Sequence, residues 1–125
     1  MLHRVSPSEA YRRVEIDAYI VGGEAAQLTR LCLAETIGAI NRALYFDSKG
    51  QTDQRGNCIA KAIASIQALK LGVDRKQPLA DALFIVYGSA IGRLTRSLRN
   101  FDPQAIGAIR QDFLEIEQAF AETQA

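Results

Sequence analysis

The feature that most constrains this chain is the three- and four-residue spacing of its apolar side chains. Near the C-terminus, Ile106, Ile109, Phe113, Ile116 and Phe120 follow one another at intervals of 3, 4, 3 and 4. This spacing places apolar side chains along one face of an α-helix, and no useful stretch shows the alternation that a half-buried β-strand requires. The sequence therefore predicts an all-α fold.

Capping residues divide the chain into five predicted helices. Ser6-Pro7-Ser8-Glu9 has the pattern of a capping box, Lys49-Gly50 is typical of a helix end, and Asp102-Pro103 is typical of a helix start. The expected helices cover residues 7–20, 24–48, 53–71, 77–99 and 103–122. Four long helices with short polar connections predict an antiparallel four-helix bundle over residues 24–122. The whole chain, residues 1–125, is expected to form a single domain in which residues 1–22 are a short N-terminal helical cap segment.

The segment 24–48 carries two apolar stripes. Leu33, Ile37, Ile40 and Leu44 form the first stripe, and Leu28, Leu31 and Cys32 begin the second. A helix that is apolar on more than one face either lies at the centre of its bundle or offers a face to a partner.

The catalytic and metal-binding inventory is poor. The 125 residues include one histidine, His3, and two cysteines, Cys32 and Cys58, which lie in apolar segments and are expected to be buried free thiols. No metal site, cofactor or enzymatic activity is therefore expected. With 15 basic and 14 acidic residues, the net charge of +1 gives no general attraction to nucleic acid or to a membrane surface. The chain shows neither a secretory signal nor an apolar run of about 18 residues, which predicts a cytoplasmic protein with no membrane insertion.

Three arginines recur on the segment 77–99. Arg93, Arg96 and Arg99 are spaced at i, i+3 and i+6 near its end. The simplest interpretation is a favourable placement of positive charge at a helix C-terminus. A docking patch for an acidic partner is the second interpretation, and a nucleic-acid surface is the third.

Several short motifs occur in an order that resembles one known family. Ala10-Tyr11 with Val14, Lys61-Ala62 with the residues Ile66, Leu69 and Asp74 that follow, and Tyr87, Ile91, Arg93, Leu94 and Asp102-Pro103 match its pattern. The family is FliS, the bacterial flagellin-export chaperones, and the resemblance covers about residues 8–122. It implies a cytosolic helical bundle that binds the disordered C-terminal segment of flagellin, prevents premature polymerisation and assists type III export.

The resemblance and the apolar spacing together indicate a partner-binding surface. We hypothesise that it includes Tyr11, Leu28, Leu31, Ile63, Ile66, Leu69, Tyr87 and Leu94. Tyr11 belongs to the segment 1–22, which either covers the groove as a lid or lies beside the client. The protein could also contact the flagellar export apparatus or pair as a homodimer. The alternatives are a structural or self-associating bundle without a client and, last, a small-molecule enzyme.

Overall fold

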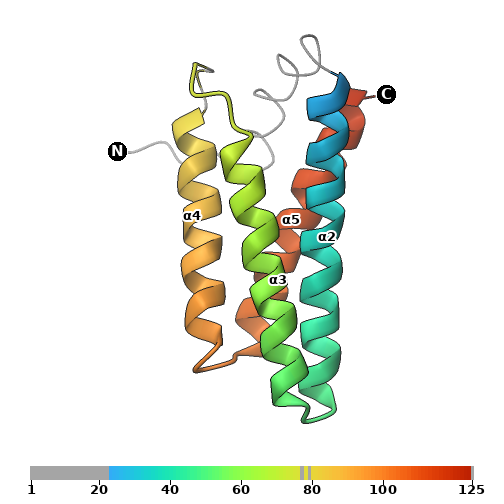
Figure 1. Cartoon of the computed structure of the whole chain (residues 1–125), viewed down its shortest axis with the longest axis vertical. Helices are drawn as coiled ribbons and strands as arrows, with labels where there is room; N and C mark the ends of the chain where they lie inside the picture. Colours follow the sequence, from blue (N-terminus) through green and yellow to red (C-terminus); the bar gives the residue numbers. More distant parts are fainter. Residues whose placement is uncertain (1–22, 77, 79, 125) are drawn as a thin grey trace.

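The structure is a computed structural model that describes residues 23–76, 78 and 80–124. These residues form four helices: α2 (Gly23–Ser48), α3 (Thr52–Leu71), α4 (Ala80–Ser97) and α5 (Pro103–Gln124). Successive helices run in opposite directions, with α3 between α2 and α4 in the view of Figure 1. The prediction of an all-α helical bundle is confirmed. The predicted helix 7–20 lies outside the described residues.

The end of α2 is set by a glycine in the left-handed region. Gly50 has a φ of 69°, a conformation that glycine adopts without the steric cost that a Cβ would bring. Around it, the Lys49 and Gln51 amides donate hydrogen bonds to the Phe46 carbonyl oxygen at 3.1 and 3.0 Å. These bonds satisfy a carbonyl that the helix itself leaves unpaired. The helix end predicted at Lys49-Gly50 is confirmed.

The turn between α4 and α5 also follows the sequence signals closely. The Asp102 carboxylate accepts a hydrogen bond from the Gln104 amide at 3.1 Å, so Asp102 caps α5 as predicted. The helix α4 covers Ala80–Ser97 and ends at Ser97 rather than at Arg99. The start predicted at residue 77 lies outside the described residues. At the end of α4, the Leu98 and Arg99 amides form tight turn bonds with carbonyls three residues back, so the last residues leave α-helical geometry.

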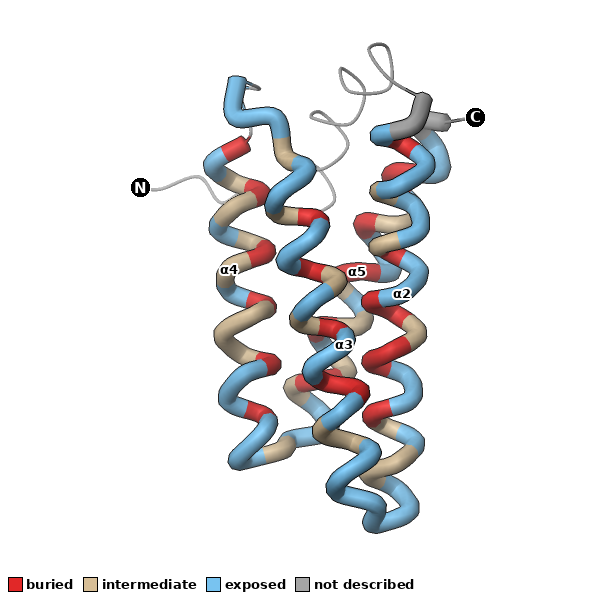
Figure 2. The backbone as a smooth tube through the Cα atoms, in the orientation of Figure 1, coloured by how far each residue is buried: buried red, intermediate tan, exposed pale blue. Residues whose placement is uncertain are grey.

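The core runs along the inside of the bundle. Buried positions recur on one side of each helix and face the interior in Figure 2. On α5 the whole predicted seam from Ile106 to Phe120 is buried, with each of its five large side chains at most 1% exposed. The Phe113 ring stacks on Tyr87 of α4, with ring centroids 6.2 Å apart and planes inclined by 19°. Such a pair adds to the stabilisation from burial alone.

One half-buried arginine joins three elements at the end of the bundle where α2 meets α3. From the start of α3, Arg55 donates a hydrogen bond through Nη1 to Oδ1 of Asp47 near the end of α2, at 2.8 Å. Its guanidinium carbon lies 4.6 Å from the ring centroid of Phe101, in the connection between α4 and α5. The ion pair and the cation–π contact together hold this end of the bundle in a fixed arrangement.

The helices do not contact one another equally. The most extensive contact is between α2 and α3; α2 also packs on α5 and α3 on α4, while α4 and α5 touch least. The order does not simply follow the chain, because α2 packs on α5, which lies far from it in the sequence, whereas α4 and α5 touch least although a short turn joins them. Within the described helices, no segment is long and apolar enough to cross a membrane.

Candidate partner-binding site

The two apolar stripes of α2 have different environments. Leu33, Ile37 and Ile40 of the first stripe are buried in the core. In the second stripe, Leu28 and Leu31 are 63% and 61% exposed. Because these two leucines lie one turn apart on the same face, they form a continuous apolar surface on α2. The structure thus leaves one apolar face of α2 exposed, as the second interpretation of this helix requires, and its role in partner binding stays a prediction.

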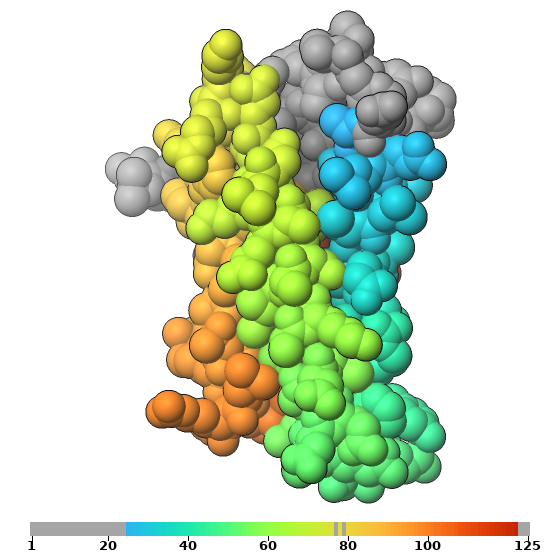
Figure 3. All heavy atoms as spheres, viewed as in Figure 1, coloured from blue at the N-terminus to red at the C-terminus, as the bar shows by residue number. Residues whose placement is uncertain are grey.

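Next to this exposed surface, a groove lies between α2 and α3. Its volume is about 420 Å³, and we call it the α2–α3 groove; it is lined by Leu31, Cys32, Glu35, Ala64, Ser65 and Ala68. Figure 3 shows the face of the molecule on which the two helices stand side by side, with a furrow at their boundary. The groove exists because α3 presents only small side chains there. It is shallow and mostly apolar, and its lining spans about one turn of each helix. An apolar side chain of an amphipathic partner helix fits such a groove.

The polar groups of the groove lie at its edges. Glu35 is exposed and accepts a hydrogen bond from Arg42 at 3.4 Å, a contact too long and too solvated to hold the carboxylate firmly. Cys32 is only partly buried, unlike the fully buried thiol expected from the sequence, because it faces this groove. Partial burial removes water from the sulfur and raises the pKa of the Cys32 thiol, since the charged thiolate loses solvation.

The other predicted site residues lie deeper in the molecule. Ile63 is partly buried and packs against the core, whereas Ile66 and Leu69 of α3 belong to the core itself. On α4, Tyr87 and Leu94 are 1% and 0% exposed. The structure therefore brings Leu28 and Leu31 together at the surface, whereas the core holds Ile66, Leu69, Tyr87 and Leu94. Their part in partner binding stays a prediction. Tyr11 lies outside the described residues.

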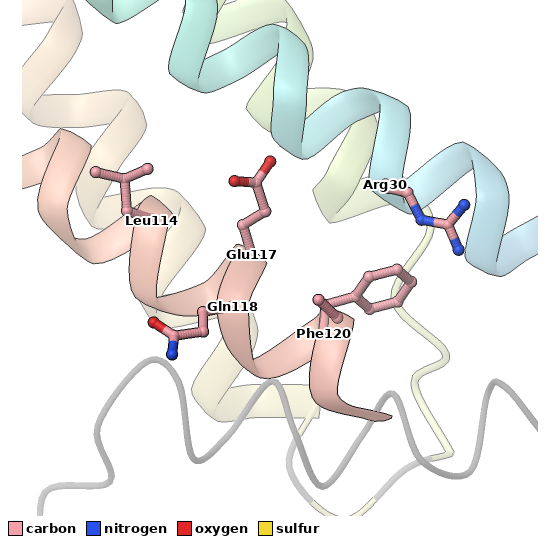
Figure 4. A pocket seen from close by; sticks show the side chains of 6 residues that line it. Arg30, Leu114, Glu117, Gln118 and Phe120 are labelled. Carbon is pink, nitrogen blue, oxygen red and sulfur yellow. The ribbon is translucent and has the colours of Figure 1, made fainter. Parts of the chain in front are cut away.

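A second hollow lies on the other side of α2, against α5. Its volume is about 490 Å³, and it is lined by Arg30, Leu114, Glu117, Gln118, Phe120 and Ala121. In Figure 4, Glu117 reaches from α5 toward α2, and Arg30 extends from α2 near the end of α5. The Arg30 guanidinium carbon is 6.0 Å from the centroid of the Phe120 ring. This hollow carries charge of both signs, so it suits an apolar partner less well than the α2–α3 groove.

Sequence reasoning missed the α3 side of the α2–α3 groove. Ala64, Ser65 and Ala68 escaped notice because hydrophobic patterns are carried by large side chains. The available signal was the pair of alanines four residues apart, which leaves a shallow strip on one helix face.

The residues that line the groove supply mainly apolar surface. Within the described parts of the chain, no group of three or more His, Cys, Asp or Glu side chains could hold a metal ion. Cys32 and Cys58 are both free thiols. The site consists of exposed leucines beside a groove with small side chains, and its chemistry is apolar contact.

These features define a small all-α helical-bundle protein with an exposed apolar groove on one face. Residues 7–125 match the family model described as flagellar protein FliS, and the chain belongs to that family. It is 26% identical over 122 residues to the flagellar secretion chaperone FliS of Salmonella typhimurium, covering 95% of this chain and 90% of the relative. No solved structure matches the chain at a significant level. The resemblance found in the sequence is thereby confirmed.

Proposed function

We propose that this protein is a flagellar secretion chaperone, acting in the cytoplasm, whose client is the C-terminal segment of flagellin. The proposal is supported by membership of the FliS family and by the name of the Salmonella relative. Binding would keep the client from polymerising before type III export. The protein would act by binding alone, with residues 24–122 as one bundle domain preceded by the segment 1–22.

The observation that carries the proposal is the exposed leucine pair beside the α2–α3 groove. A disordered client loses conformational entropy when it becomes helical, and this cost is typically about 2–5 kcal/mol. Burying one leucine fully from water contributes about 1.5–3 kcal/mol. Leu28 and Leu31, together with apolar client side chains in the groove, therefore supply enough apolar area to offset the ordering cost.

Cys32 provides a direct test of where the client lies. The chain has two cysteines, and Cys58 is only 6% exposed, so a thiol reagent reports mainly on Cys32 in the groove. The reaction of the protein with a thiol reagent is followed with and without a saturating flagellin C-terminal peptide. We expect the peptide to slow the reaction of Cys32 at least about tenfold, since the thiolate must be reached to react.

The rate of the thiol reaction is compared with the extent of peptide binding, which fluorescence anisotropy measures independently. A Cys32→Ala variant is the control, because it should remove the fast thiol reaction and leave any slow signal from Cys58. If the peptide binds but Cys32 reacts at its original rate, the client lies elsewhere on the bundle. If the peptide does not bind at all, the proposed client is wrong.

Self-association is the second candidate, because two copies could bury the same leucine pair. In that case sedimentation would show a dimer that Leu31→Asp dissociates.

A further inference from the structure

The three arginines singled out in the sequence surround a hollow at the turn between α4 and α5. The hollow has a volume of about 380 Å³; it is lined by Arg93, Arg96, Ser97, Arg99, Asn100, Asp102, Ala105, Ile106 and Ile109. Arg93 is half-buried, and Arg96 and Arg99 are exposed. We call these three residues the arginine patch. Ile106 and Ile109 are each only 1% exposed, so the apolar part of the hollow within reach of a partner is formed mainly by Ala105 and the aliphatic stems of the arginines, which we call the apolar floor.

In the part of the chain that the structure describes, the hollow carries an excess of positive charge. Among the described residues, the two ion pairs use Arg42 and Arg55, and none uses an arginine of the patch. The one carboxylate that lines the hollow, that of Asp102, accepts a hydrogen bond from the Gln104 amide as the cap of α5. Three guanidinium groups thus face one carboxylate that is already engaged.

The turn that carries the patch is held in place before any partner arrives. The Asn100 amide donates a hydrogen bond to the Arg96 carbonyl oxygen at 3.1 Å, which closes the end of α4. The neighbouring Phe101 ring lies under the guanidinium of Arg55, which also pairs with Asp47. A fixed backbone reduces the entropy that would be lost on binding and so favours recognition.

The patch is well separated from the α2–α3 groove. The groove uses the first half of α2 and the second half of α3, so it lies toward the end of the bundle where α2 begins. Because α4 runs antiparallel to α3, the patch lies toward the opposite end, where Figure 1 shows the α4–α5 turn. In Figure 3, side chains of this end of α4 extend outward from the body of the molecule.

The chemistry of the hollow selects one kind of partner. Guanidinium groups bind carboxylates through charge-assisted hydrogen bonds, and the apolar floor accepts an apolar side chain. A nucleic acid would gain from aromatic residues on which bases stack, but no aromatic side chain lines the hollow. A simple phosphate would not use the apolar floor. An acidic peptide with an interspersed leucine or isoleucine fits both the arginines and the apolar floor.

We propose that the arginine patch is a second docking site, which binds an acidic segment with an apolar side chain on a partner protein other than the client. It would let the bundle hold its client in the α2–α3 groove and a second protein at the α4–α5 turn simultaneously. This inference does not depend on the identity of the client.

The test measures binding of a labelled peptide in which glutamate and aspartate surround a central leucine. Fluorescence anisotropy is recorded at low salt for the full chain and for the triple variant Arg93→Gln, Arg96→Gln, Arg99→Gln. We expect the wild type to bind and the triple variant to lose about tenfold or more in affinity. Replacing the acidic residues of the peptide with their amides should abolish binding, and added salt should weaken it.

A charge-matched variant, Lys61→Gln, Lys70→Gln, Lys76→Gln, controls for the loss of net positive charge away from the hollow. It should bind the acidic peptide within about twofold of the wild type. Circular dichroism confirms that both triple variants stay helical, since arginines at a helix C-terminus also stabilise the helix. Leu31→Asp should leave this binding unchanged, which separates the two sites.

Four outcomes would overturn the proposal. The first is no binding of the acidic peptide, and the second is equal loss in the two triple variants. The third is unfolding of the arginine variant together with full binding by each of the three single arginine variants. The fourth is tighter arginine-dependent binding of a single-stranded oligonucleotide or of tripolyphosphate than of the peptide, which would make the patch a site for phosphate groups.

Discussion

At the scale of single residues, Leu31 lies at the edge of the α2–α3 groove with 61% of its surface exposed. A charged side chain at this position stays in water in the free protein, so Leu31→Asp should remain folded. In the complex it would place a carboxylate against apolar client side chains. We expect the flagellin peptide to bind about 10–100-fold more weakly, the loss that corresponds to one buried leucine.

Leu71→Asp is the matched control for this change. Leu71 is 88% exposed at the end of α3 and does not line the groove. Anisotropy with the flagellin peptide and far-UV circular dichroism should show near-normal binding and full helicity for Leu71→Asp. Equal weakening by both variants, or loss of helicity in Leu31→Asp, would contradict the assignment of Leu31 to the binding surface.

Substitutions of Tyr87 can show whether this residue belongs to the binding surface or to the core. The sequence places it among the binding residues, but it is 1% exposed and stacks on Phe113. Tyr87→Ala would leave a cavity between α4 and α5 and should lower the free energy of unfolding by about 3–5 kcal/mol. Urea unfolding measures this value, and Tyr87→Phe, which keeps the ring, should lose much less. A Tyr87→Ala variant of normal stability that fails to bind the client would instead make Tyr87 a binding residue.

At the scale of elements, Arg55 determines how the ends of α2 and α3 meet the α4–α5 turn. Its ion pair with Asp47 is 2.8 Å long, and the two side chains are only 21% and 26% exposed. Arg55→Ala removes this pair and the contact with Phe101. Because both contacts are partly shielded from water, we expect a loss of about 1–3 kcal/mol in the free energy of unfolding.

The pair between Arg42 and Glu35 is the internal comparison for Arg55. It is 3.4 Å long, and its side chains are 48% and 54% exposed. Arg42→Ala should therefore cost at most about 1 kcal/mol. Urea unfolding of both variants measures the difference. If the two substitutions lower the free energy of unfolding equally, the contacts of Arg55 do not stabilise the bundle as their distances and burial indicate.

The elements also show which parts of this fold a sequence can reveal. The seam of α5 was predictable, because a repeat of large apolar residues both defines a helix and identifies its buried face. For α2 the two stripes were visible, but not which of them faced the core. The periodicity shows which residues share a face of the helix, but it does not show what that face packs against. The α2–α3 groove was not predictable, since it depends on small side chains such as Ala64 and Ala68 lying opposite Leu31.

At the scale of the whole molecule, two surfaces of different chemistry lie toward opposite ends of the bundle. The α2–α3 groove is apolar, whereas the arginine patch combines positive charge with an apolar floor. Both surfaces depend on helix pairs packed by the same core, which connects α2, α3, α4 and α5. Substitutions in that core should therefore weaken both kinds of binding together, whereas Leu31→Asp and the arginine variant should each affect one.

The stability of the whole bundle should respond to its client but not to metal or redox conditions. Both cysteines are free, and the described residues offer no group of side chains that could hold a metal ion. We expect the thermal midpoint to be the same with and without EDTA and with and without reductant. A ligand that binds only the folded state adds about 2.7 kcal/mol at one hundred times its dissociation constant. The flagellin peptide should accordingly raise the midpoint by several degrees, whereas Leu31→Asp at the same peptide concentration should show a clearly smaller rise.

A fall in the midpoint with EDTA would reveal a metal that the fold requires, and a fall with reductant would reveal a disulfide between Cys32 and Cys58. An equal rise for the wild type and Leu31→Asp would place the client outside the α2–α3 groove.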